Sequence, residues 1–559
     1  MKQCLDMLGA VRTRFGPEAA RIRLDGLERA RHLDWRAPRR LRAYHDLLLF
    51  MAAHPDSAGM ARLVDAELRR LTGVAASIIE RGSGGPLEAT GIGGTVIEST
   101  FSSAMTDWLS RRVPRSVEIA WEDGEGGRDL DELVAACLSP TERDGLIGGD
   151  LSVEDWIRQA IGTREQSTLR WVLDRLSSLD VGASAHDAVF NALELEVRWT
   201  LDEPACSRTL ARFPARHLFA QRGALRRDGS ARTWIGRALP SPRRLDVATR
   251  EALLDAARIT LLSRYRETDP VTHANEHDVT LYSLERGIDV ALIGMRPERR
   301  LPLESYVGYV AARNRVPVAY GGAWIFLDRA EIGINVFDEF RGGESAFLFA
   351  QLLRVYHRHF DVRRFDVDPF QIGVDNEDAI RSGAYWFYDR FGFRSPDEAA
   401  ARRADAERAA LAGDRGGRTA KATLRRLAAG GLSLSIGARD AAPTPDVHAL
   451  GLAVTRSIEA DHGGDRAKAE ARARRRLARL LGIGDRRRWS AAERASFSSL
   501  SPLVALVPGL ETWSARDRRA LVMVMRAKGG VREDDFIRRL RRHARLRRGL
   551  ASVAAGATA

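Results

Sequence analysis

The sequence predicts a central α/β domain with a mixed sheet, flanked by mainly α-helical regions on both sides. Apolar positions recur at helical spacing in the first half of the chain, runs rich in β-branched and aromatic residues begin near residue 278, and helical patterns return after residue 397. The expected parts are a mainly helical region of one or two domains at 1–270, the α/β domain at 271–396, a linker with a helical segment at 397–449, and a basic helical domain at 450–559.

The composition favours a folded chain in the cytoplasm. Of the 559 residues, 44% are hydrophobic and 29% are charged, which is enough apolar material for packed cores. No apolar run has the length of a membrane span, and the first residues lack the pattern of a secretory signal, so we expect no membrane span. Cys4, Cys137 and Cys206 match neither a disulfide framework nor a metal site, and we expect no metal cofactor.

The positive charge is concentrated in the last third of the chain. Residues 401–559 carry 34 Arg or Lys and 16 Asp or Glu, a net charge of +18, whereas the whole chain carries +13. Segments such as "RARRRLARL" and "RRLRRHARLRR" would suit a polyanion, either nucleic acid phosphates or an acidic protein. The alternative is the solvated face of amphipathic helices. Only four aromatic residues occur in this third, so base stacking has little support.

The central region predicts strands joined by short connections and interrupted by one apolar helix. The helix is expected over residues 345–360, where Gln351, Arg354 and Arg358 leave most of the circumference apolar. A crossover through such a helix makes the two strands that flank it parallel, so the sheet should be mixed. The expected strands are two within 278–295 and one each at 306–312, 317–327, 330–337 and 363–370.

The segment "VFDEFRGGESA", residues 336–346, has the features of an anion-binding turn. Gly342 and Gly343 remove Cβ atoms where a phosphate would approach the backbone, and the dipole of the following helix favours an anion. Arg341 adds a positive charge. Glu344 adds a carboxylate, which would repel a phosphate if the two groups were close and poorly solvated.

This segment resembles the phosphate-binding motif of the GNAT superfamily of acyl-CoA-dependent N-acyltransferases, Arg/Gln-x-x-Gly-x-Gly/Ala after the fourth strand. The downstream segment "NEDAIRSGAYWFYDRFGF" is similar to the Asn-x-x-Ala helix of that family, which ends in Tyr followed by Gly-Phe. The resemblance covers residues 278–396 and implies acetyl-CoA or another acyl-CoA as cosubstrate. It assigns cofactor binding to Val336, Arg341, Gly342, Gly343, Ser345, Ala346 and Asn376.

The resemblance also implies an activity, namely N-acyl transfer, most simply N-acetyl transfer, to a small-molecule or protein amine. In the family, the residue at the position of Tyr388 protonates the departing thiolate, and a phenol with a pKa near 10 can act as that acid. The backbone N–H near Val336 would bind the thioester carbonyl. Glu331 and Glu304 are candidates for the base that deprotonates the amine; alternatively, each is a solvated surface carboxylate.

Two other functions stay open at the level of sequence. Some relatives with this fold take their acyl group from aminoacyl-tRNA, a donor that needs no pyrophosphate cradle and that is compatible with Glu344 and with the basic last third. Alternatively, the chain is a non-enzymatic scaffold in which the α/β domain is vestigial and the helical flanks bind proteins.

Overall fold

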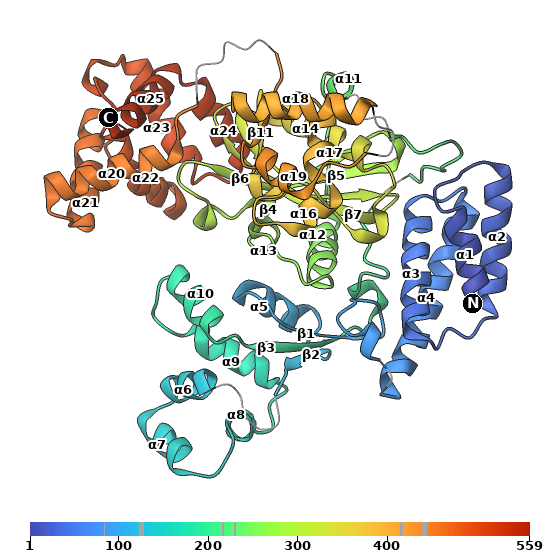
Figure 1. Ribbon diagram of the computed structural model, residues 1–559. Helices are drawn as coiled ribbons and strands as arrows, with labels where there is room; N and C mark the ends of the chain where they lie inside the picture. The colour runs from blue at the N-terminus through green and yellow to red at the C-terminus, as the bar shows by residue number, and fades with distance from the viewer. Residues whose placement is uncertain are drawn as a thin grey trace. The chain divides into compact units, whose positions relative to one another are not determined.

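The computed structural model of the chain describes residues 1–82, 84–121, 128–214, 217–227, 231–413, 417–437 and 444–558 (Figure 1). The chain forms two compact units. Unit 1 contains residues 1–224, 247–272 and 312–317, and unit 2 contains residues 225–246, 273–311 and 318–559. Two parts of the predicted linker, residues 414–416 and 438–443, lie outside the described residues.

Unit 1 contains a small sheet among its helices. Strands β1 (Val96–Thr100), β3 (Glu196–Thr200) and β2 (Val117–Ile119) pair antiparallel with β3 in the centre. Val197 and Trp199 alternate with exposed residues along β3 and are buried in a core shared with the neighbouring helices. The helices are α1 Lys2–Ala10, α2 Pro17–Arg31, α3 Pro38–Ala53, α4 Ala58–Glu80, α5 Ser103–Arg112, α6 Arg128–Cys137, α7 Pro140–Gly148, α8 Val153–Ile161, α9 Thr168–Ser177, α10 Ala183–Ala192, α12 Val247–Leu262 and α13 Asp269–Thr272.

Unit 2 is built around a mixed sheet with the order β11-β10-β8-β7-β6-β5-β4, and β9 pairs with β7. The predicted parallel pair is confirmed, because β8 and β10 run parallel on either side of the crossover helix. Strands β4 and β5, β7 and β8, and β10 and β11 pair antiparallel. The strands are β4 Ala274–Ser283, β5 Ile288–Met295, β6 Ser305–Arg313, β7 Val316–Phe326, β8 Arg329–Ile332, β9 Asn335–Val336, β10 Arg364–Val367 and β11 Leu432–Ser435.

The crossover helix α14 (Ser345–Phe360) has the predicted bounds and is buried more completely than its pattern indicates. Its apolar residues are buried together with the polar residues Gln351 and Arg354, whose exposed fractions are 0% and 3%. A preceding segment, residues 231–238, covers this polar side, where Arg354 donates to the carbonyl of Ala238 and Arg358 to that of Arg237. Helix α11 (Ala231–Ile235) of that segment packs on α14, and the Trp234 and Phe347 rings meet edge to face at 4.9 Å.

The remaining helices of unit 2 follow the crossover. The short helices α15 to α17 follow β10 in the chain, and a bundle of longer helices, α20 to α25, ends it. Figure 1 shows most of that bundle in orange to red. The bundle has its own core, into which Phe326 and Leu327 of the sheet insert. The helices are α15 Pro369–Ile372, α16 Glu377–Ser382, α17 Ala384–Arg390, α18 Glu398–Gly413, α19 Lys421–Ala428, α20 Val447–His462, α21 Arg466–Leu480, α22 Ala491–Val504, α23 Ala515–Ala527, α24 Glu533–Arg542 and α25 Ala544–Thr558.

A buried group of charges joins the bundle to the sheet. Lys528 Nζ donates to Glu533 Oε1 at 2.6 Å, and Arg300 Nε lies 3.3 Å from the other carboxylate oxygen. Arg300 also donates to the carbonyl of Val531 at 3.0 Å, and the Glu533 backbone N–H donates to Asp278 at 2.8 Å. The side chains of Arg300, Lys528 and Glu533 are no more than 3% exposed. Charges buried to this extent stabilise a fold only while each one keeps its partner.

The change Glu533→Gln tests this dependence. It leaves Arg300 and Lys528 buried without their shared carboxylate, so the free energy of unfolding should fall by about 3–5 kcal/mol. The measurement is urea unfolding followed by tryptophan fluorescence. Asp535→Asn is the matched control, because Asp535 on the same helix pairs with Arg538 and Arg539 at the surface. Equal losses in the two variants would contradict the importance of the buried group.

Candidate functional site

The turn before α14 exposes the N-terminus of a helix that is otherwise buried. Gly342 is exposed and has φ 78, a left-handed conformation that favours glycine. The backbone N–H of Gly343 donates to the carbonyl of Phe340 at 3.2 Å. Ser345 and Ala346 are partly buried, and their N–H groups lie in the first turn, where a helix provides no acceptor. These groups have the geometry that binds an anion.

The Glu344 carboxylate, expected to repel an anion, is held by two partners. Its Oε1 accepts from the Arg226 backbone N–H at 2.7 Å and from Arg286 Nη2 at 2.5 Å, and its Oε2 lies 3.3 Å from Arg286 Nε. The side chain is 3% exposed and makes no capping hydrogen bond to α14. The charge of the carboxylate is therefore compensated within the protein, and the amides at the start of α14 are not occupied by it.

The surroundings of this turn carry more positive than negative charge. Arg227 Nη2 lies 3.5 Å from the carbonyl of Gly342, and the Arg226 guanidinium lies 5.9 Å from the centre of the Phe347 ring in the first turn of α14. Arg341 is exposed and pairs with the exposed Asp338 at 2.9 Å. The charged residues of the turn and its described neighbours are Arg226, Arg227, Arg286, Arg341, Asp338, Glu339 and Glu344. Four cations and three anions leave a net charge of +1, which favours an anionic ligand.

Tyr388 lies where the strands of the sheet separate. Strand β8 pairs with both β7 and β10, whereas β9 on the same chain segment pairs with β7. The connecting residue Ile334 forms a backbone hydrogen bond with the Tyr388 hydroxyl. Burial raises the pKa of Tyr388 above its ordinary value, and the Ile334 hydrogen bond partly opposes this shift. The phenol thus stays protonated over the physiological range of pH.

The packing of α17 against α14 fixes this tyrosine. The Tyr388 ring is 3% exposed and meets the Phe349 ring edge to face at 5.4 Å. On strand β6, the Tyr309 hydroxyl donates to the carbonyl of Gly333 at 2.8 Å. Two phenols therefore contact consecutive residues of the segment between β8 and β9, so the backbone at this point is held in a defined position.

The other predicted residues occupy different places. Glu331 lies on β8, 3.3 Å from Arg329, and burial raises the pKa of its carboxyl group. Burial also raises the pKa of Glu304. Val336 lies on β9 and is partly buried opposite Ala319. Asn376 caps α16, where its Oδ1 accepts from the Ala379 N–H at 3.0 Å. A structural role accounts for this asparagine, and the turn before α14 does not include it.

Several residues of the site were not predicted from the sequence. Arg226 and Arg227 lie more than a hundred positions before the turn they contact, in a segment without a motif. Arg286 lies in the β4–β5 connection, where its φ of 63 is unusual for a residue with a side chain. In the sequence, Tyr309 is indistinguishable from an ordinary core residue of a strand. The local signal for a cationic partner was Glu344 beside the glycine pair, because a carboxylate that is buried at such a position requires one.

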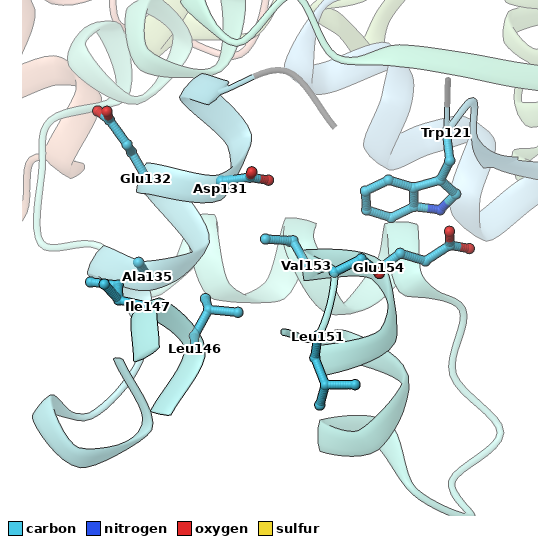
Figure 2. A pocket seen from close by; sticks show the side chains of 10 residues that line it. Trp121, Asp131, Glu132, Ala135, Leu146, Ile147, Leu151, Val153 and Glu154 are labelled. Atoms are coloured by element: carbon cyan, nitrogen blue, oxygen red, sulfur yellow. The ribbon is translucent and has the colours of Figure 1, made fainter. Parts of the chain in front are cut away.

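Unit 1 contains a separate pocket of about 310 Å³ between α6, α7 and α8 (Figure 2). In Figure 2 the Asp131 carboxylate and the Trp121 ring face the space from opposite sides, and Leu146, Leu151 and Val153 line its lower part. Glu132 and Glu154 add two further carboxylates to the lining. A pocket with three acidic side chains is unsuited to an anionic cofactor such as an acyl-CoA.

Comparison with known proteins assigns no family to this chain. No family model, curated protein or solved structure matches it. None of the helices in the described part of the chain combines the length and apolar character of a membrane span. Within the same residues, no group of three or more His, Cys, Asp or Glu is arranged to hold a metal ion.

A double-mutant cycle on Arg286 and Glu344 tests the ion pair that compensates the turn. Glu344→Gln and Arg286→Gln should each lower the free energy of unfolding, and the two losses should couple by about 2 kcal/mol because the residues share one buried contact. The measurement is urea unfolding of the wild type, both single variants and the double variant.

The control cycle combines Glu344→Gln with Arg381→Gln, an exposed arginine on α16 that pairs with Asp378. Those losses should add within about 0.5 kcal/mol. Additive losses in the Arg286 cycle would show that Glu344 does not depend on this partner.

Proposed function

We propose that the chain is an N-acyltransferase that moves an acyl group, most simply acetyl, from an acyl-CoA to an amine. The observation that carries the proposal is the position of Tyr388, a buried phenol at the backbone of Ile334 where the β8–β9 segment separates from β10. The turn before α14 supports it, because its exposed glycine, unoccupied first-turn amides and net positive charge suit a pyrophosphate. The general arrangement of the GNAT superfamily is compatible with this mixed sheet.

In the proposed reaction the amine nitrogen attacks the thioester carbonyl carbon and forms a tetrahedral intermediate. A backbone N–H near Val336 would stabilise the negative charge that develops on the carbonyl oxygen. The carbon–sulfur bond then breaks, and Tyr388 gives its proton to the departing thiolate, which leaves as CoA. The nitrogen loses its proton to Glu331 or to water, and the acylated amine is released.

The burial of Tyr388 and Glu331 bears on these roles. A phenol whose pKa is raised by burial keeps its proton until the thiolate forms. The same shift makes it a weaker acid, so the transfer requires the thiolate to lie within hydrogen-bond distance of the hydroxyl. A carboxyl group whose pKa is raised by burial, as in Glu331, is a stronger base than an ordinary surface carboxylate. Arg341, Gly342, Gly343, Ser345 and Ala346 would hold the pyrophosphate of the cosubstrate.

A thermal-shift titration tests binding of the cosubstrate. Because a ligand that binds the folded state stabilises it by mass action, acetyl-CoA at about 1 mM should raise the melting temperature by about 2 °C or more. Acetyl phosphate at the same concentration is the control for a nonspecific anion effect. Equal melting temperatures with and without acetyl-CoA would contradict the proposal.

The change Tyr388→Phe tests the general acid. It should lower kcat for release of CoA thiol by about 10²-fold or more with little change in KM, because general acid catalysis typically contributes 10²–10⁴-fold. The measurement is thiol release from acetyl-CoA in the presence of a panel of amines. The control is Tyr385→Phe on the same helix, because Tyr385 is equally buried and its hydroxyl makes no hydrogen bond among the described residues. Equal rates in both variants would exclude Tyr388 as the acid.

The pH dependence of kcat follows from the direction of the Tyr388 shift. Since burial raises its pKa, the acid form persists above the ordinary pKa of a phenol. We therefore expect no loss of kcat between about pH 8 and 10 from deprotonation of this acid. A fall with an apparent pKa near 9 that disappears in Tyr388→Phe would assign a lowered pKa to Tyr388 and contradict the structure.

A further inference from the structure

Residues 466–494 carry a concentrated positive charge. They contain eleven Arg or Lys and three Asp or Glu, a net charge of +8. They form α21, the following loop and the beginning of α22 within the C-terminal bundle of unit 2 (Figure 1). A net charge of this size within 29 residues creates a local positive potential that attracts polyanions.

Part of this charge lines a cleft of about 560 Å³ between α21 and α22, here called the arginine cleft. Three of its guanidinium groups are held by neutral partners: Arg474 Nη1 donates to Ser498 Oγ at 3.1 Å, Arg494 donates to the carbonyl of Trp489, and Arg486 lies 5.5 Å from the centre of the Phe497 ring. Such contacts orient the side chains and leave their charge uncompensated. The lining residues are Arg474, Asp485, Arg486, Arg487, Arg494 and Ser498.

The ion pairs of this region do not neutralise the arginine cleft. Across residues 466–498, all of which the structure describes, Arg474, Arg486 and Arg494 pair with no carboxylate, and the exposed Arg487 lies 4.0 Å from Asp485. A second basic cleft of unit 2 differs, because its Arg541 pairs with Asp361 and its Arg547 lies 3.3 Å from Asp328. Of these two clefts, the arginine cleft has the larger uncompensated charge, because four arginines face one aspartate there and four face two in the other.

The exposed side of α21 adds a stripe of four arginines. They follow the spacing i, i+3, i+4 and i+7, which places them on one face of the helix. The stripe is about 10 Å long at 1.5 Å per residue, close to three base-pair steps of about 3.4 Å along the axis of a duplex. Its members are Arg472, Arg475, Arg476 and Arg479, all exposed.

The neighbouring apolar residues favour one class of partner. The aromatic residues of this region, Trp489 and Phe497, are buried, so they cannot stack on the bases of a single strand. No large apolar side chain is exposed across residues 466–498, whereas a membrane-binding surface inserts such side chains beside its basic ones. Phosphates along a duplex need neither exposed aromatic nor exposed apolar side chains, so their chemistry fits this surface.

We propose that the C-terminal bundle binds the phosphate backbone of double-stranded nucleic acid through the arginine cleft and the stripe on α21. The contacts are to phosphates, so binding should depend steeply on salt and little on sequence. This inference is independent of acyl transfer, because it involves other residues and another ligand.

The test is fluorescence anisotropy of the full chain with labelled 20-base-pair DNA and RNA duplexes over a range of NaCl concentrations. Both duplexes present the same phosphate chemistry, and their relative affinities show which one is preferred. The triple variant Arg474→Gln, Arg486→Gln, Arg494→Gln should reduce the slope of log K against log salt by about 2–3 and weaken binding by about tenfold or more. The double variant Arg486→Gln, Arg487→Gln, in the loop, repeats the test if the triple variant has a lowered melting temperature.

The matched control removes three exposed charges elsewhere in unit 2. The variant Arg381→Gln, Arg402→Gln, Arg403→Gln should keep wild-type affinity and salt slope, since these residues lie on α16 and α18. Equal weakening by the control and the cleft variants would overturn the proposal. Tighter binding to phosphatidylserine vesicles or to poly-glutamate than to either duplex would also overturn it, in favour of a membrane or an acidic protein.

Discussion

The arrangement of the α/β domain depends on one buried ion pair, between Arg286 and Glu344. Helix α14 lies between the sheet and residues 231–238, so most of its side chains are buried, Glu344 at its N-cap included. A carboxylate at its N-terminus is tolerated there because Arg286 and a backbone N–H bind it. The same contacts direct the carboxylate away from the first-turn amides, which is the condition for those amides to receive an anion.

The other elements of the candidate site derive their positions from α14. Helix α17 packs on it through Phe349, and this contact places Tyr388 at the backbone of Ile334. The phenol lies at the backbone between β8 and β9, and the turn lies at the N-terminus of α14, the helix on which α17 packs. An acyl-CoA has a thioester and a pyrophosphate to occupy such a pair of positions, which is why the fold and the local chemistry support the same proposal.

The sequence predicted the elements that local patterns define and missed those that depend on distant contacts. The bounds of α14 were correct because a glycine pair precedes an unbroken apolar helix, and the strands of the central sheet followed from β-rich runs between short turns. Strands β1, β3 and β11 are five residues or shorter and lie in helical surroundings, so their patterns were too short to identify. The contact between residues 231–238 and α14 was not predictable, because more than a hundred residues separate the two segments and no periodic pattern in the sequence links them.

The central claim is that the amides of Ser345, Ala346 and Phe347 can bind the pyrophosphate of an acyl-CoA. Hydrogen exchange of peptides from residues 341–350, followed by mass spectrometry with and without acetyl-CoA, measures this directly. The account predicts slower exchange at these amides when acetyl-CoA is added, because each N–H that donates to a phosphate is protected. Unchanged exchange in this segment at a concentration that raises the melting temperature would place the ligand elsewhere and contradict the claim.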